Sequence, residues 1–299
     1  MFSLRIKYFK QLLNIKYAVF SALFLSATTL FALTFPEIAL GFSEKGFSTI
    51  LIGGCAFLCA RTVGILVNQI IDRDIDKKNP RTAFRVLPAK KLSINFVFFI
   101  TVLASLCFLV PCIFISKECS WLALFAILLM IIYAYAKRIT YLCHWILGLI
   151  YYLAILMNFY ALSSGPLSLK TFIIASLWGI TAAMIIAAND IIYAIQDLEF
   201  DRAEKLYSIP ACFGKAKAIR IASVCLLLSL LSYVAMAVLA SFSKLGLILS
   251  LLPVFVIGKT IKNYYVLDKK HVNLERCFFK GNIYLALSFF IVMISLLIS

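Results

Sequence analysis

Charged residues are scarce in this sequence. Only 14% of the 299 residues are Asp, Glu, Lys or Arg, whereas 64% are hydrophobic, and the mean hydropathy is +1.02. A soluble domain carries about 25% charged and about 45–50% apolar residues, and disordered chains are poorer still in apolar residues. The composition excludes both classes, as well as a small disulfide scaffold, and it predicts a polytopic membrane protein.

Acidic residues and histidines are few. The 13 Asp and Glu are outnumbered by 29 Lys and Arg, and the histidines are His144 and His271. The nine cysteines are scattered, mostly inside apolar runs, and none forms a CxxC pair, so a zinc site is not expected. In a soluble protein the formal charge of +16 would suggest a nucleic-acid partner. In a membrane protein the same excess usually fixes topology, and no nucleic-acid partner is expected.

Apolar runs recur along the whole chain, and most are long enough to cross a bilayer. They fall at about 17–35, 48–71, 94–114, 120–136, 141–163, 171–193, 219–241, 245–258 and 281–298. The prediction is an all-α integral membrane protein, a nine-transmembrane-helix bundle that forms one domain over residues 1–299.

The orientation follows from the basic residues. We interpret residues 1–16 as a basic amphipathic segment at the cytoplasmic surface, so nine spans place the N-terminus in the cytoplasm and the C-terminus outside. This arrangement leaves 24 of the 29 Lys and Arg in cytoplasmic segments and four in outside loops. The distribution agrees with the positive-inside rule.

The first of two acidic stretches follows the second apolar run. Asn68, Asp72 and Asp76 are spaced at intervals of four, which places them on one face of a helix. Arg61, seven residues before Asn68, lies two turns earlier on that face. Asp74 points roughly the other way and is interpreted as a solvated charge.

The second acidic stretch follows the sixth apolar run, on the same predicted side of the membrane. Asp190, either Tyr193 or Ala194, Asp197 and Asp201 are spaced to share one helical face. A solvated helix end would explain either stretch alone. Two matching stripes on one side favour a binding site, because charges at the end of a membrane helix are costly to desolvate.

Carboxylates stacked four residues apart repel one another, so we expect a cation between the two stripes. Oxygen ligands without histidine suit Mg²⁺, which is usually held by a few carboxylates together with substrate phosphates. A diphosphate clamped there would leave a lipid tail running down between apolar helices. The basic residues available to its oxygens are Arg61, Lys78, Arg81, Arg85, Lys137, Arg138, Arg202 and Lys205.

These motifs resemble those of the UbiA superfamily of membrane prenyltransferases. That family carries Asn-(Asp)-x-x-Asp-x-x-x-Asp after its second span and Asp-x-x-x-Asp after its sixth, on a nine-helix bundle. Here the strings are NQIIDRDIDKKNPRT and NDIIYAIQDLEFDRAEKLYSIPACFG, with YAYAKRITYLCHWILG between them. Their wording is most similar to the 4-hydroxybenzoate polyprenyltransferase-like branch. Gln69 stands where the family often has Asp, so one potential metal ligand is absent.

The resemblance implies Mg²⁺-dependent transfer of a polyprenyl group from an allylic polyprenyl diphosphate to a small aromatic acid in ubiquinone or menaquinone biosynthesis. The expected acceptor is of the 4-hydroxybenzoate type, and a futalosine-derived naphthoate is the alternative. The enzyme is expected in a bacterial-type cytoplasmic membrane, with its active site at the cytoplasmic face and its helices in the lipid bilayer.

The resemblance also implies roles for individual residues. The implied Mg²⁺ ligands are Asn68, Asp72, Asp76, Asp197 and Asp201. The implied catalytic residues are Asp72, Asp76, Asp190, Asp197 and Asp201. The residues implied to bind the substrates are Arg61, Asn68, Arg81, Lys137, Arg138, Tyr193 and Lys205. His144 is more simply explained as a hydrogen-bonded interfacial residue than as an acceptor contact.

Other membrane functions fit the pattern less well. A transporter usually places its charges near the bilayer midplane on helices broken by Gly or Pro, whereas these acids lie at one mouth and the second and sixth runs lack Pro. A phosphotransferase of the CDP-alcohol kind would need Asp-Gly pairs, which this sequence lacks. A purely structural protein would not need two aligned aspartate stripes.

Overall fold

The computed structural model describes residues 8, 11–12, 18–269 and 274–298, and this part of the chain is helical without strands. The predicted N-terminal interfacial segment lies mostly outside the described residues. The longer helices are α2 (Ala18–Ala32), α4 (Ser48–Ile71), α6 (Ile94–Ile115), α7 (Lys117–Ala136), α8 (Cys143–Leu162), α9 (Leu169–Ala194), α12 (Lys215–Leu239), α14 (Leu251–Lys269) and α15 (Leu274–Ile298). The shorter ones are α3 (Pro36–Lys45), α5 (Arg73–Lys78), the 3₁₀ turn η2 (Ile195–Asp197), α10 (Leu198–Ala203), α11 (Ile209–Phe213) and α13 (Lys244–Leu249).

Within the described residues, eight helices are long and apolar enough to cross a membrane, or nine if α2 and α3 form one broken span. The two helices of that pair are bent by 107°. Pro36 begins α3, and because proline lacks an N–H and restricts the residue before it, α2 cannot continue through this point. The eighth predicted run was too short, since α13 and α14 together continue to Val266, past Lys259 and Lys262.

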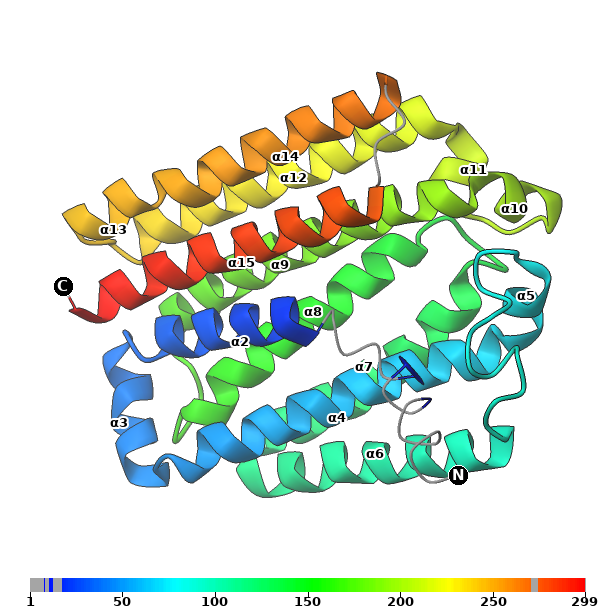
Figure 1. Ribbon diagram of the computed structural model, residues 1–299. Helices are drawn as coiled ribbons and strands as arrows, with labels where there is room; N and C mark the ends of the chain where they lie inside the picture. The colour runs from blue at the N-terminus through cyan, green and yellow to red at the C-terminus, as the bar shows by residue number, and fades with distance from the viewer. Residues whose placement is uncertain (1–7, 9–10, 13–17, 270–273, 299) are drawn as a thin grey trace.

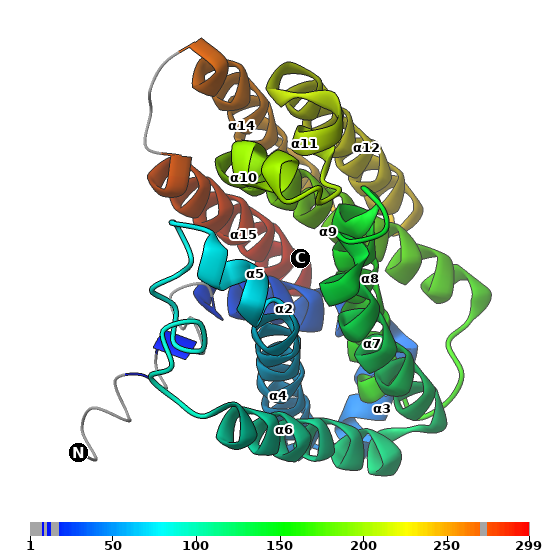
Figure 2. The ribbon, with the colours of Figure 1, turned by 90° about the vertical axis from the view of Figure 1, so that its right-hand side faces the viewer.

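The long helices run side by side, and the short helices α5, α10 and α11 gather at one end of the bundle (Figure 1). The C-terminal end of α15 lies at the opposite end. Viewed from the end that carries α5, α10 and α11, the helices α2, α4, α7, α8, α9 and α15 surround the centre of the molecule (Figure 2). Both acidic motifs therefore belong to the same end of the bundle.

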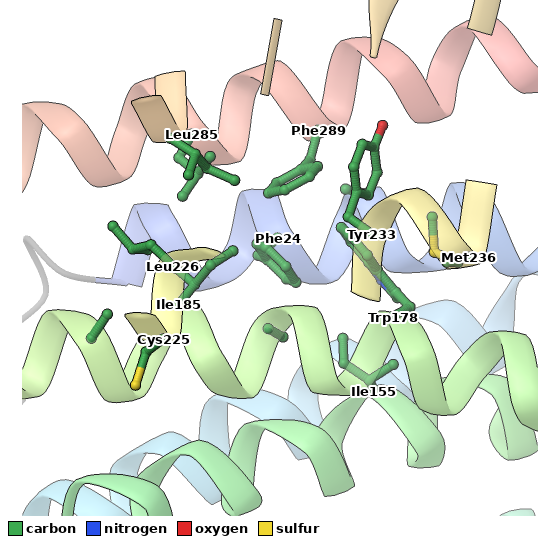
Figure 3. Close-up of a cluster of buried hydrophobic side chains, with 14 of the residues drawn as sticks. Phe24, Ile155, Trp178, Ile185, Cys225, Leu226, Tyr233, Met236, Leu285 and Phe289 are labelled. Carbon is green, nitrogen blue, oxygen red and sulfur yellow. The ribbon is translucent and has the colours of Figure 1, made fainter. Parts of the chain in front are cut away.

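Aromatic residues pack the centre where α2, α9, α12 and α15 meet (Figure 3). Trp178 on α9 is fully buried and stacks on Phe24 at 4.9 Å, with Phe289 edge-on at 5.0 Å. The indole Nε1 donates to Thr28 Oγ1 at 2.9 Å, which satisfies the polar atom of the buried ring. This cluster fixes α9, the helix that leads into the second acidic motif.

Candidate functional site

A cavity of about 1780 Å³ runs along α4 between α2, α7 and α8. Its wall on α4 extends from Thr49 to Gln69, a distance of about 30 Å at the rise of an α-helix. Most of the lining is apolar. At the end near the acidic motifs, however, the wall is polar, with Asn68, Arg81, Arg85, Tyr193 and Gln196.

Asp72 lies where α4 passes into α5, and two groups bind its carboxylate. Asn68 donates from Nδ2 to Oδ2 at 2.9 Å, so these two side chains lie on one face, as their spacing predicts. Arg138 donates from Nη2 to Oδ1 at 3.0 Å and to the carbonyl of Ile71 at the same distance. Burial raises the pKa of Asp72 above its usual value, although Lys137 and Arg138 oppose the shift.

Asp76 is held by the loop that follows it. Its side chain is buried, and Arg85 donates from Nη1 to Oδ2 at 2.8 Å. The Thr82 hydroxyl donates to the backbone carbonyl of Asp76 at 3.0 Å. These contacts fold the loop back over α5 and bring its basic residues to the mouth of the cavity.

Arg81 joins the first motif to the second. Its Nε donates to Oδ1 of Asp197 at 2.8 Å, Nη2 contacts Oδ2, and Nη1 donates to the Tyr193 hydroxyl at 3.1 Å. Asn79 adds a donor to Asp197 Oδ1 at 2.8 Å. Burial alone would lower the pKa of Arg81, but the Asp197 carboxylate outweighs it and raises that pKa. The pair therefore stays charged.

The helix that carries the second motif is interrupted, although the carboxylates of Asp190, Asp197 and Asp201 all lie near Lys137. The sequence predicted a single helical face, whereas α9 ends at Ala194, the turn η2 follows, and α10 begins at Leu198. A 3₁₀ turn has 3.0 rather than 3.6 residues per turn, so the helix changes register between Tyr193 and Asp201. Asp201, which is buried, accepts from the Ser208 hydroxyl at 2.8 Å, while Asp197 contacts Arg81.

Lys137 lies among the carboxylates of Asp190, Asp197 and Asp201. Burial lowers its pKa, but the three negative charges outweigh burial and the net shift is upward. Its backbone carbonyl accepts from the N–H of Tyr207 at 2.6 Å. Because Lys137 lies among these carboxylates, it brings a positive charge into the space between α7 and the second motif.

Asp190 contacts a residue that the sequence did not connect with it. Its Oδ2 lies 2.7 Å from Nδ1 of His144, which is fully buried in the protein and hydrogen-bonded as predicted. The Tyr133 hydroxyl adjoins the same carboxylate. Residues 46 positions apart show no spacing signal, so this contact could not be predicted from the sequence. Tyr133 stands within the YAYAKR segment but was not singled out there.

Some predicted residues lie away from this cluster. Arg61 lines the cavity two turns deeper than Asn68, beside Tyr151. Lys205 is exposed at the end of α10, with a left-handed backbone (φ 56°). The predicted solvated charge Asp74 is exposed and pairs with its neighbour Arg73.

Two further polar residues contact segments outside the acidic stripes. Lys78, the last residue of α5, donates to Glu204 Oε2 at 2.6 Å and so links the end of α5 to the end of α10. Gln69 donates from Nε2 to the carbonyl of Leu12 at 2.9 Å, a contact that an aspartate could not make.

The cations near the two motifs are side chains of the protein itself, the arginines Arg81, Arg85 and Arg138 together with Lys137. Among the described residues, no three His, Cys, Asp or Glu side chains gather as a ready-made metal cage. The donor set nevertheless fits Mg²⁺, because carboxylate and amide oxygens meet at one mouth, and this ion needs only a few protein ligands when substrate phosphates supply the rest. Its binding would require the arginines to release their carboxylates.

Comparison with known proteins agrees with this architecture. The profile of the UbiA prenyltransferase family matches residues 17–294. The 4-hydroxybenzoate octaprenyltransferase of Francisella tularensis subsp. mediasiatica is 30% identical over 239 residues, which is 78% of each chain. The protein of the same name from Blochmanniella floridana is 29% identical over 213 residues, covering 68% of this chain and 72% of that one.

Two solved structures share the fold. The apo structure of a UbiA homolog from Aeropyrum pernix K1 has a TM-score of 0.78 at 22% identity and covers 94% of this chain and 98% of its own. A UbiA homolog from Archaeoglobus fulgidus, bound to DMAPP and Mg²⁺, has a TM-score of 0.69 at 16% identity and covers 97% and 99%. These likenesses extend along nearly the whole bundle.

Proposed function

The chain belongs to the UbiA prenyltransferase family, and we propose that it transfers a polyprenyl group from an allylic polyprenyl diphosphate to a 4-hydroxybenzoate-type aromatic acid. The reaction forms a carbon–carbon bond and releases diphosphate. We place the site at the cytoplasmic face of a bacterial cytoplasmic membrane, on the basis of the distribution of Lys and Arg. The relatives named 4-hydroxybenzoate octaprenyltransferase support this acceptor class.

The single observation that carries the proposal is the cavity and its polar end. An apolar channel of about 30 Å along α4 accommodates an extended hydrocarbon tail. It ends at Asn68, Arg81 and Arg85, where a diphosphate meets arginine forks. A substrate with a charged head and a long apolar tail matches both parts of this space.

Mg²⁺ would be held by Asp72, Asp76 and Asp197, with Asn68 and Asp201 beside them. Bound there, the ion would neutralise diphosphate charge and act as a Lewis acid on its oxygens. The solved Archaeoglobus fulgidus homolog bound to DMAPP and Mg²⁺ supports the choice of ion.

The arginines would exchange partners when the substrates bind. Arg81, Arg85 and Arg138 contact Asp197, Asp76 and Asp72 in the structure. Once those carboxylates serve a metal ion, the guanidinium groups would turn to the diphosphate oxygens. Because negative charge grows on the diphosphate as the C–O bond lengthens, fixed cations stabilise the transition state more than the ground state.

The walls of the cavity keep water away from the allylic cation, which is the second product of C–O bond cleavage. The allylic cation would form inside an apolar cavity, where little water is present to capture it. Tyr193, whose ring lies 5.2 Å from the Arg81 guanidinium carbon, would stand beside the reacting carbon. An aromatic ring face stabilises a nearby cation.

Diphosphate release from the purified protein in detergent tests the proposal. A long-chain prenyl diphosphate is supplied with Mg²⁺, first alone, then with 4-hydroxybenzoate, and then with a 1,4-dihydroxynaphthoate-type acid. Release that depends on 4-hydroxybenzoate, together with a prenylated product of the expected mass, is the expected result. Release with the naphthoate alone would keep the reaction class and replace the acceptor. Release with neither acid would contradict the proposal.

A further inference from the structure

A buried histidine joins three elements beside the mouth of the cavity. His144, in the first turn of α8, contacts Oδ2 of Asp190 on α9 through Nδ1 at 2.7 Å. Its Nε2 accepts a hydrogen bond from the backbone N–H of Ile209 at 3.3 Å. Ile209 is the first residue of α11, so the imidazole ties α8, α9 and α11 together.

These two contacts determine which nitrogen carries the proton. A neutral imidazole has one N–H and one acceptor nitrogen. Because Nε2 accepts from Ile209, the proton of His144 lies on Nδ1 and is donated to Asp190. A second proton on Nε2 would face the Ile209 N–H and abolish that hydrogen bond. His144 is therefore a neutral donor to Asp190.

Asp190 is thus held differently from Asp72, Asp76 and Asp197, which pair with arginines. It accepts from neutral His144, adjoins the Tyr133 hydroxyl, and lies near Lys137, whose charge Asp197 and Asp201 share. The hydrogen bonds from His144 and Tyr133 favour the ionised carboxylate, which is the form that can accept a proton. The same hydrogen bonds fix the position of the carboxylate.

Tyr133 connects Asp190 to the cavity. Tyr133 lines the cavity, as do Asn68 and Tyr193 at the polar end. Its hydroxyl adjoins the Asp190 carboxylate, whose side chain is 19% exposed. A proton that leaves a molecule in the cavity therefore has a short route through the phenol to Asp190.

We propose that Asp190, acting through Tyr133, takes up the proton that the aromatic ring loses on prenylation, and that His144 is the positioning residue that holds Asp190 for this task. The inference rests on the proposed function. The allylic C–O bond breaks with its electron pair on the diphosphate, and the ring carbon bonds to the allylic carbon. The ring C–H bond then breaks and its electrons restore aromaticity. Its proton passes to the Tyr133 oxygen while the Tyr133 hydroxyl proton passes to Asp190.

Two substitutions of His144 separate this role from simple packing. His144→Asn keeps an N–H near the place of Nδ1 and loses the acceptor for Ile209, whereas His144→Leu loses both. Asp190→Asn removes the base with almost no change in volume and provides a second route if the leucine variant does not fold. Thermal unfolding and the KM for the prenyl diphosphate check that the site is intact.

The decisive measurement compares 4-hydroxybenzoate with its ring-deuterated form. We expect His144→Leu and Asp190→Asn to lower kcat by at least about 10²-fold, the usual contribution of a general base. Both variants should show a primary isotope effect, because ring deprotonation becomes rate-limiting, with the donor KM unchanged. His144→Asn should keep a kcat and an isotope effect close to those of the unmodified protein.

The results also separate this inference from the proposed function. If the unmodified protein turns over no aromatic acid, the proposed function fails and the inference fails with it. If turnover is present, equal losses in His144→Asn and His144→Leu without an isotope effect would overturn the inference alone. Normal turnover by a folded Asp190→Asn variant would also overturn the inference while leaving the proposed function intact.

Discussion

Arg81 and Asp197 are 116 positions apart in the chain, yet the arginine Nε lies 2.8 Å from the aspartate Oδ1, and a second guanidinium nitrogen contacts Oδ2. The pair connects the loop after α5 to the turn η2, and so connects the two acidic motifs. A third donor, Nη1, reaches the Tyr193 hydroxyl at 3.1 Å. The planar guanidinium makes all three contacts at once, which an ammonium group could not.

The motif carboxylates should be essential for turnover. We expect Asp72→Ala and Asp197→Ala each to lower the rate of acceptor-dependent diphosphate release by roughly 10²–10³-fold or more, as for removal of one transition-state-stabilising group. Asp74→Ala is the matched control, because Asp74 belongs to the same motif but is exposed. Rates near those of the unmodified protein in Asp72→Ala or Asp197→Ala would contradict their assignment.

Arg81→Lys should impair the site although it keeps the charge. Lysine cannot reproduce the fork to Asp197 together with the contact to Tyr193. We expect a higher KM for the prenyl diphosphate and a lower kcat, with little change in the KM for the aromatic acid. Steady-state kinetics with each substrate varied in turn gives the result. An unchanged donor KM would show that Arg81 serves only to join the two motifs.

Removal of divalent metal should abolish binding of the diphosphate head but not of the tail. With EDTA, we expect the prenyl diphosphate to lose affinity, because the carboxylates of Asp72, Asp76 and Asp197 would repel it without a bridging cation. A prenyl alcohol of the same length should bind equally well with and without Mg²⁺. Equilibrium binding of the two labelled ligands provides the measurement. Equal diphosphate affinity in EDTA and in Mg²⁺ would exclude the metal bridge.

A bulky side chain inside the cavity should discriminate between donors by length. Ala154 lines the cavity midway along α8, so Ala154→Phe should lower turnover of a long-chain donor more than that of a two-isoprene donor. Ala235→Phe on the exposed face of α12 is the control, since it adds the same bulk outside the cavity. Competition between the two donors in one reaction measures the ratio directly. Equal loss for both lengths would place the tail elsewhere.

Close packing of α8 on α9 should depend on Gly148. A Cβ there would lie 2.6 Å from the carbonyl oxygen of Ala183, which is backbone and cannot move aside easily. We expect Gly148→Ala to destabilise the protein by about 1–3 kcal/mol, as overpacking does. Gly54→Ala, where no atom lies within 4 Å of the added carbon, should be close to neutral. Thermal unfolding in detergent compares the two, and equal Tm values would refute the close contact.

Much of the fold could be predicted from the apolar pattern. The helical bundle and the family resemblance are confirmed, because helices that face lipid must be apolar over about 20 residues and this signal is local. Two features of the fold could not be predicted from the apolar pattern, for physical reasons. The bend before Pro36 and the continuation of α14 past Lys259 depend on backbone geometry and on packing against neighbouring helices, which hydropathy does not record.

The sequence by itself determined that this chain forms a membrane bundle with two acidic motifs at one end, because composition and helical spacing act over a few turns. Only the tertiary structure decided which charged side chains pair with one another. Arg81 contacts Asp197, Arg85 contacts Asp76, and Asp190 contacts a histidine rather than an arginine. Such contacts join residues brought together by the packing of α7, α8 and α9, and by a loop that folds back on itself. No spacing in the sequence encodes these distances, because they depend on how whole helices pack.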